Sequence, residues 1–93
     1  MKHLRGQILD FLKRIYPRDI EEIGIISVFY EYHRDKDIRQ SLQYLVDKGY
    51  VEKRVVKHPY RKRQKVAFYK ITANGIDLLE GTVEDAGVVL EDE

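Results

Sequence analysis

Cysteine is absent from this 93-residue chain, which excludes disulfide bonds, thiolate metal sites and cysteine nucleophiles. Long apolar stretches are absent too. The longest run without a charged residue, Ile23 to Tyr30, is far shorter than the roughly 20 residues that a transmembrane helix needs. The first residues, Met1 to Gly6, lack the apolar core of a signal peptide. We therefore expect a cytoplasmic protein with no membrane span.

Clusters of catalytic or metal-binding residues are also missing from the sequence. The three histidines, His3, His33 and His58, are far apart, so no pattern predicts a metal site. There is no glycine-rich phosphate loop and no Ser-His-Asp arrangement. The acidic pairs, at 21–22 and 35–37, fall at expected helix starts, where carboxylates usually cap or stabilise the helix. We expect no enzyme activity, no cofactor and no metal.

The charge is divided unevenly along the chain. All 17 lysines and arginines and 11 of the 16 acids lie in residues 1–81, whereas residues 82–93 contain five acids and no base. Within the first part, residues 52–65 hold seven bases and one acid. This segment can attract a polyanion more strongly than the whole-chain charge of +1 suggests. A solvated loop that only aids solubility is the alternative.

Apolar periodicity predicts three helices in the first half of the chain. Leu4, Ile8, Leu12 and Ile15 recur at helical spacing, which predicts a helix over 3–15 that Pro17 ends. A second helix is expected over about 20–32, with an N-terminal cap from Asp19 and Glu22, and with Ile20, Ile23 and either Ile26 or Val28 facing inward. Its β-branched residues also allow a short strand within this segment.

The third helix has the clearest pattern. Ile38, Leu42, Leu45 and Val46 form an apolar stripe, Asp35 is expected to cap the helix, and Gly49 follows its last turn. The predicted range is 36–48.

After Gly49 the pattern changes to that of strands. Residues 50–57 and 65–72 are rich in valine and aromatic residues, and the basic connector 58–64 makes them a hairpin with an extended tip. Thr72 is expected to cap a last short helix over 73–80, which Gly81 ends. We expect the acidic tail, 82–93, to be partly or wholly disordered. It either folds back over the basic loop and competes with a polyanion or serves only as a solubilising end.

The order helix, helix, helix, strand, strand, helix resembles the winged helix-turn-helix family. Ile38-x-x-x-Leu42-x-x-Leu45-x-x-x-Gly49-Tyr50-Val51 is similar to a recognition helix that leads into the first wing strand. Tyr69-Lys70-Ile71-Thr72-x-x-Gly75-x-x-Leu78-Leu79 is similar to the end of a wing that enters the last helix. Together the motifs resemble small bacterial regulators of the PadR, ArsR and MarR types, without the Cys and His clusters of ArsR-type metal sensors.

This resemblance implies an α+β, mainly α, fold: a three-helix core, a two-stranded β-hairpin wing and a short C-terminal helix, with residues 1–81 as the domain and 82–93 as the tail. It also implies a sequence-specific regulator of transcription that binds double-stranded DNA. A helix fits the major groove, where arginine reads guanine and glutamine reads adenine. Basic residues of the wing would neutralise phosphates. The expected DNA-binding residues are Arg34, Lys36, Arg39, Gln40, Gln43, Lys57, Arg61, Lys62, Arg63 and Lys65.

Several points stay open at this level. The polar face of the third helix can be an ordinary solvated face. Tyr60 can stack on a base or sugar, although packing across the wing is the preferred interpretation. Many relatives in this family form homodimers through their first and last helices, but the last helix here is short. A protein-interaction module and a structured-RNA binder are the alternatives to a DNA-binding regulator.

Overall fold

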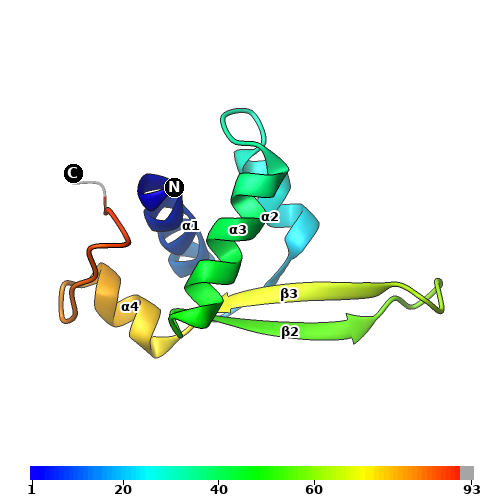
Figure 1. Ribbon diagram of the computed structural model, residues 1–93. Helices are drawn as coiled ribbons and strands as arrows, with labels where there is room; N and C mark the ends of the chain where they lie inside the picture. The colour runs from blue at the N-terminus through cyan, green and yellow to red at the C-terminus, as the bar shows by residue number, and fades with distance from the viewer. Residues whose placement is uncertain (91–93) are drawn as a thin grey trace.

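The computed structural model describes residues 1–90 as four helices and a three-stranded antiparallel sheet (Figure 1). In chain order the elements are α1 (Lys2–Ile15), β1 (Ile20–Glu21), α2 (Glu22–Phe29), α3 (Asp35–Asp47), β2 (Val51–Lys57), β3 (Lys65–Ile71) and α4 (Ala73–Leu79). This is the α+β, mainly helical, winged-helix arrangement that the sequence predicts.

The sheet has the order β1-β3-β2, and β2 and β3 form a long antiparallel hairpin. Its register pairs Val51 with Ile71 at the base and Lys57 with Lys65 at the far end. β1 adds a third strand by pairing Ile20 with Tyr69. We call β2, the loop 58–64 and β3 the wing. It projects from the body on the right of Figure 1.

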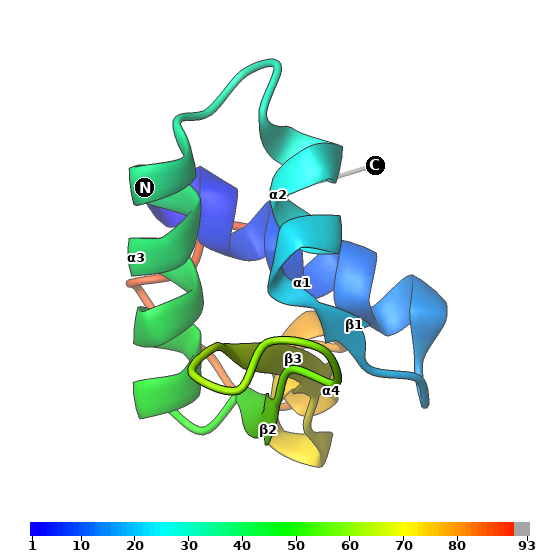
Figure 2. The ribbon, with the colours of Figure 1, turned by 90° about the vertical axis from the view of Figure 1, so that its right-hand side faces the viewer.

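The helices α1, α2 and α3 lie on one side of this sheet, as the view from the wing side shows (Figure 2). Their apolar stripes meet the base of the sheet in one core, in which Ile8, Leu12, Leu42 and Leu45 are fully buried. Val51, Tyr69 and Ile71 supply the contribution of the strands. Burying such side chains removes apolar area from water, which is the main stabilising term of a small domain.

Local signals set most of the element ends as predicted. The first helix ends at Ile15, before Pro17. Gly49 follows α3 with a φ of 80°, which a residue with a side chain rarely adopts. Thr72 caps α4, because its hydroxyl accepts a hydrogen bond from the Gly75 N–H at 3.1 Å.

The second helix differs from its prediction at both ends. It covers only Glu22–Phe29, because residues 20–21 form β1, the short strand that the β-branched residues allowed. The expected cap by Asp19 is wrong, since the Asp19 carboxylate accepts hydrogen bonds from Arg54 instead. With Ile20 in a strand, the inward stripe is reset: Ile25 and Ile26 are buried, whereas Ile23 is 61% exposed.

The third helix begins one residue earlier than predicted, at Asp35. Arg34 takes the N-cap position and makes no capping hydrogen bond with its side chain, whereas Asp35 Oδ1 accepts from the Lys36 N–H at 2.8 Å. Asp35 thus stands one residue after the N-cap, the position that the sequence predicts for it. It still accepts a first-turn N–H, and its negative charge interacts favourably with the helix dipole.

The sequence predicts a partly or wholly disordered tail, but residues 82–90, a segment that we call the strap, are packed on the body. The strap packs against α1: Val88 is 6% exposed, and the Val89 N–H donates to the Lys2 carbonyl oxygen at 3.1 Å. Arg5 Nη1 also donates to the Gly87 carbonyl oxygen at 2.9 Å. The strap lies at the end of the molecule opposite the wing tip (Figure 1), so it does not fold over the wing. The acids at 91–93 lie outside the described residues.

Candidate nucleic-acid interface

Four polar residues follow one another along the exposed side of α3. Lys36, Arg39, Gln40 and Gln43 are all exposed, at the spacing that places residues on one helix face. The opposite stripe of α3, which contains Ile38, Leu42 and Leu45, is fully buried. We call these four residues the reading face, since they are the ones predicted to contact bases.

Two members of the reading face already have partners within the protein. Arg39 lies 3.3 Å from Asp35 and 3.6 Å from Glu22, measured between nitrogen and oxygen atoms. Gln43 donates to the Asp47 carboxylate at 2.8 Å. These contacts are exposed, so each contributes little stability, typically below ~1 kcal/mol. Their main effect is to hold the side chains in defined directions.

The strand register determines which face of the wing is basic. Side chains alternate along a strand, so Lys53, Val55 and Lys57 share the face of buried Val51. On β3 the same face holds Tyr69 and Lys65. Lys53, Lys57 and Lys65 therefore lie along the wing on the same face of the sheet as the helices. The pairing of Lys57 with Lys65 places two positive charges opposite each other.

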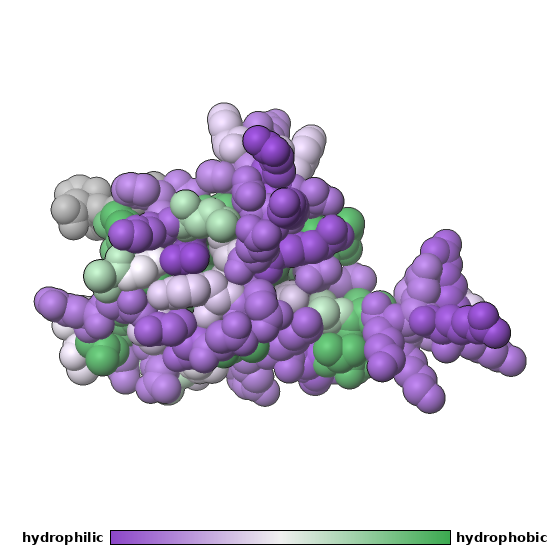
Figure 3. Space-filling view, viewed as in Figure 1, coloured by the Kyte–Doolittle hydropathy of each residue, from purple (hydrophilic) through white to green (hydrophobic). Residues whose placement is uncertain are grey.

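The wing tip carries the other predicted bases. Arg61, Lys62 and Arg63 are exposed, and within residues 1–90 none of the predicted wing bases forms an ion pair with an acid. Figure 3 shows this tip as a projection of hydrophilic side chains, with apolar side chains nearer its base. The positive charge that the sequence located is therefore free to meet an external anion.

A histidine organises the backbone of the wing tip. His58 Nδ1 accepts hydrogen bonds from the N–H groups of Tyr60 and Arg61 at 3.1 and 3.2 Å. The Tyr60 ring is 90% exposed, with an edge contact only to the His58 ring. The expectation that Tyr60 packs across the wing is wrong, because nearly all of its surface is exposed.

Arg34 and Lys53 complete the basic surface, whereas Arg54 lies on the opposite face of the wing. Arg34 is exposed immediately before α3, as predicted. Sequence reasoning did not select Lys53 or Arg54, although both lie in the basic segment 52–65. Arg54 is engaged on the other face of the wing, where its guanidinium stacks over Phe68 at 4.7 Å and bonds Asp19. Strand alternation alone would have assigned Lys53 to the helix-bearing face and Arg54 to the opposite one.

A buried tyrosine connects the wing to α2. Tyr69 is 3% exposed, and its hydroxyl donates to Glu22 Oε1 at 2.9 Å. Burial and this hydrogen bond raise the pKa of Tyr69 well above its usual range, so the hydroxyl stays protonated as a donor. Glu22 thus takes part in a contact between elements, whereas its position near a helix start had suggested only capping.

A second polar cluster ties the strap to the end of α3. The Asp85 carboxylate accepts from the Tyr50 hydroxyl at 2.7 Å and lies 3.3 Å from Lys48 Nζ. The hydrogen bond from Tyr50, together with one from the Gly87 N–H, lowers the pKa of Asp85, and the same bond raises the pKa of Tyr50 to about 12. Asp85 thus has its hydrogen-bond and ion-pair partners at the C-terminal end of α3, and not in the wing.

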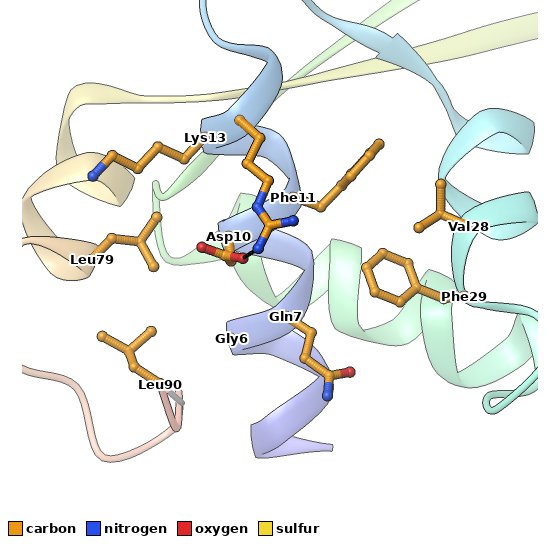
Figure 4. A pocket seen from close by; sticks show the side chains of 10 residues that line it. Gly6, Gln7, Asp10, Phe11, Lys13, Val28, Phe29, Leu79 and Leu90 are labelled. Carbon is orange, nitrogen blue, oxygen red and sulfur yellow. Dashed lines mark ion pairs between the residues drawn. The ribbon is translucent and has the colours of Figure 1, made fainter. Parts of the chain in front are cut away.

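An open pocket lies on α1, away from the reading face. Figure 4 shows Phe11, Val28 and Phe29 on one side of α1 and Leu79 and Leu90 on the other, with the Asp10–Arg14 ion pair between them. Its lining contains no histidine and no acid besides Asp10. In residues 1–90 no group of three or more His, Cys, Asp or Glu side chains is placed to hold a metal ion. None of the helices described has the length and apolar character needed to cross a membrane.

Comparisons with known proteins reveal a likeness of structure. No family model and no curated protein matches this sequence. Among solved structures, the crystal structure of Bacillus subtilis PadR in complex with operator DNA matches with a TM-score of 0.64 at 15% sequence identity. The match covers 97% of this chain and 54% of the PadR chain, so this protein spans about half the length of that neighbour. At this identity the likeness establishes a shared winged-helix fold.

Proposed function

We propose that this protein binds double-stranded DNA and regulates transcription, with the reading face of α3 in the major groove and the wing on the backbone or in the minor groove. The observation that carries the proposal is the pairing of two surfaces on one fold. A helix with exposed Arg, Lys and Gln side chains stands beside a projecting hairpin. The five bases at and near its tip, Lys57, Arg61, Lys62, Arg63 and Lys65, have no acidic partner among residues 1–90. The similar fold of PadR was solved with operator DNA.

The two surfaces would have different tasks. Bases that contact phosphates give affinity that is independent of sequence and falls as salt rises, because condensed counterions are released from the DNA. Side chains that reach base edges give sequence preference. We therefore assign Lys57, Arg61, Lys62, Arg63 and Lys65 of the wing, together with Arg34, to phosphate contacts, and the four residues of the reading face to base contacts.

We further propose that two copies bind one operator. Phe11 of α1 and Val28 of α2 line the same open pocket, and Val28 is exposed, so a second copy has an apolar surface to cover. Two copies would place their reading faces in successive major grooves, about 34–36 Å apart, on a pseudo-palindromic site. Sedimentation analysis with and without duplex DNA tests this, and a monomer that binds one copy per duplex contradicts it.

The first experiment is a titration of fluorescent duplex DNA at several salt concentrations. We expect log Kd to rise linearly with log salt, and the double variant Arg61→Ala/Arg63→Ala to reduce this slope by up to about 2. Lys2→Ala/Arg18→Ala is the matched control, because it removes two exposed charges that lie outside the wing, the reading face and the pocket on α1. Equal effects of both variants would contradict a role of the wing. Absence of duplex binding by the unaltered chain would favour a protein-binding module.

A further inference from the structure

Three elements contribute side chains to one network at the edge of the reading face. Tyr69 comes from β3, Glu22 from the first turn of α2, and Arg39 from α3. The Tyr69 hydroxyl donates to Glu22 Oε1 at 2.9 Å, and Glu22 Oε2 lies 3.6 Å from Arg39 Nε. The two oxygens of one carboxylate thus connect a buried group to an exposed arginine.

The network is progressively more exposed from the core to the surface. Tyr69 is 3% exposed, the side chain of Glu22 is 31% exposed, and that of Arg39 is 52% exposed. A residue held by core packing can fix the rotamer of the residue bonded to it, and that residue can then orient the next. The hydrogen bond from buried Tyr69 therefore fixes the Glu22 carboxylate, and that carboxylate in turn orients Arg39.

Arg39 keeps donors for an external acceptor in this arrangement. Its Nε faces Glu22 and its Nη1 faces Asp35, while Nη2 has no partner within residues 1–90. A guanidinium carries five N–H groups in a rigid plane. With two of its nitrogens placed by carboxylates, the plane has a defined direction before any ligand binds.

We propose that Glu22 and Tyr69 are positioning residues that fix the Arg39 guanidinium for recognition of one base pair, a guanine whose O6 and N7 accept two N–H donors. The inference rests on the proposed function and names how its sequence preference arises. A surface arginine that must be ordered on binding loses side-chain entropy. When the arginine is already oriented in the free protein, part of this entropy cost is absent on binding to the correct base. The penalty for unmatched donors and acceptors at a wrong base stays the same.

The same network suppresses unspecific binding. Glu22 and Asp35 place two negative charges beside Arg39, so the guanidinium attracts phosphates less than a free arginine does. Removing the Glu22 charge would therefore have two opposite effects. It would strengthen binding to any duplex and weaken the preference for the correct one.

The test uses the full chain and a set of single variants. Binding sites are first selected from a pool of random duplexes with the unaltered protein, which yields the base preference at each position. Affinities for the best duplex and for a random duplex are then measured for the unaltered protein, Glu22→Gln, Tyr69→Phe and Arg39→Ala. Glu21→Gln is the matched control. It removes the same negative charge from the neighbouring residue, and within residues 1–90 the Glu21 side chain forms no ion pair with Arg39.

We expect Glu22→Gln to tighten binding to the random duplex several-fold and to reduce the ratio between the best and random duplexes about tenfold. The lost preference should concern the same base pair that Arg39→Ala ceases to distinguish. Tyr69→Phe keeps the ring in the core and should lose part of that preference with no gain in unspecific affinity. Glu21→Gln should tighten binding to both duplexes equally and leave the ratio unchanged.

Three results would overturn the inference. Thermal melting of each variant first confirms that it is folded. If Glu22→Gln and Glu21→Gln behave alike, the carboxylate of Glu22 acts only through its charge, while the proposed function stands. If the unaltered protein binds no duplex at any salt concentration, both the proposed function and this inference fail. A preference that changes at a base pair unaffected by Arg39→Ala also contradicts the assignment.

Discussion

At the scale of single residues, the acids of this protein act mainly through specific contacts. Of the five acids in residues 82–93, Asp85 is built into a hydrogen-bonded cluster with Tyr50, Lys48 and the Gly87 N–H. A composition count treats it as one more tail charge. Its contacts make it the residue that attaches the strap to the end of α3.

Replacing Asp85 with Asn should destabilise the protein by about 1–2 kcal/mol near neutral pH, because hydrogen bonds to a charged group are lost. The folded state lowers the Asp85 pKa below the ordinary 3.8, so this stabilisation is present above pH 4 and disappears as pH falls through the folded pKa. The pKa of Tyr50 is raised to about 12. The stabilisation from its hydrogen bond to Asp85 is therefore present below pH 10 and is lost between pH 10 and 12.

Urea unfolding of the unaltered protein and Asp85→Asn across this pH range measures the difference. The difference in free energy of unfolding between the two proteins should be greatest between about pH 5 and 9, and it should become smaller at lower and at higher pH. Glu84→Gln is the control, because Glu84 is an exposed neighbour in the same strap. A constant difference from pH 3 to pH 7 would show that the carboxylate charge is not responsible.

A second residue-scale prediction concerns Ser41 on α3. Its side chain is fully buried, and its hydroxyl has no hydrogen-bond partner within residues 1–90. An unsatisfied buried hydroxyl is costly, and alanine is the better helix former. Ser41→Ala should therefore stabilise the protein by about 1 kcal/mol in urea unfolding. A loss of stability would mean that the hydroxyl has a partner in solution.

At the scale of elements, the sequence predicted what local signals control. The stripe of α3, the Thr72 cap, the glycine after α3 and the valine-rich strands each depend on residues only a few positions apart. These signals gave the helix order, the wing and the exposed positions of its bases. The roles of the ten candidate residues in DNA binding remain predictions, since exposure alone does not show what a side chain binds.

Contacts between distant residues explain what the sequence did not show. β1 exists because Ile20 and Glu21 pair with Tyr69 and Phe68 of the wing, a partner that no pattern around residue 20 reveals. The strap is ordered because Gly6 lets its backbone approach α1: a Cβ at Gly6 would overlap the Val89 carbonyl. A glycine within an amphipathic helix, together with the apolar residues 88–90, was the available signal.

Gly6→Ala provides a test at this scale, because its effect should change sign with the strap. In the full chain the added methyl group should displace the strap and cost about 1–3 kcal/mol. In a chain that ends at Gly81 the same change should stabilise α1 by up to about 1 kcal/mol, the normal gain over glycine in a helix. Urea unfolding of the four proteins measures both values, and equal signs would contradict the packing of the strap on α1.

At the scale of the whole molecule, the basic wing tip and the strap lie at opposite ends. The wing tip with its unpaired bases projects from one end, and the strap lies at the other, along a molecule with a longest dimension of 42 Å (Figure 1). At physiological salt, charges are screened over about 8 Å. The near-neutral total charge of +1 therefore conceals a wing that presents a strongly positive field to a partner.

This separation predicts that the tail acids hardly affect the wing. A variant that lacks residues 91–93 and carries Glu84→Gln removes four of the five tail acids while keeping Asp85. Its affinity for a random duplex at 0.15 M salt should stay within about twofold of the unaltered protein, because screening at that salt is effective beyond ~8 Å. Tightening of tenfold or more would instead mean that the tail competes with DNA.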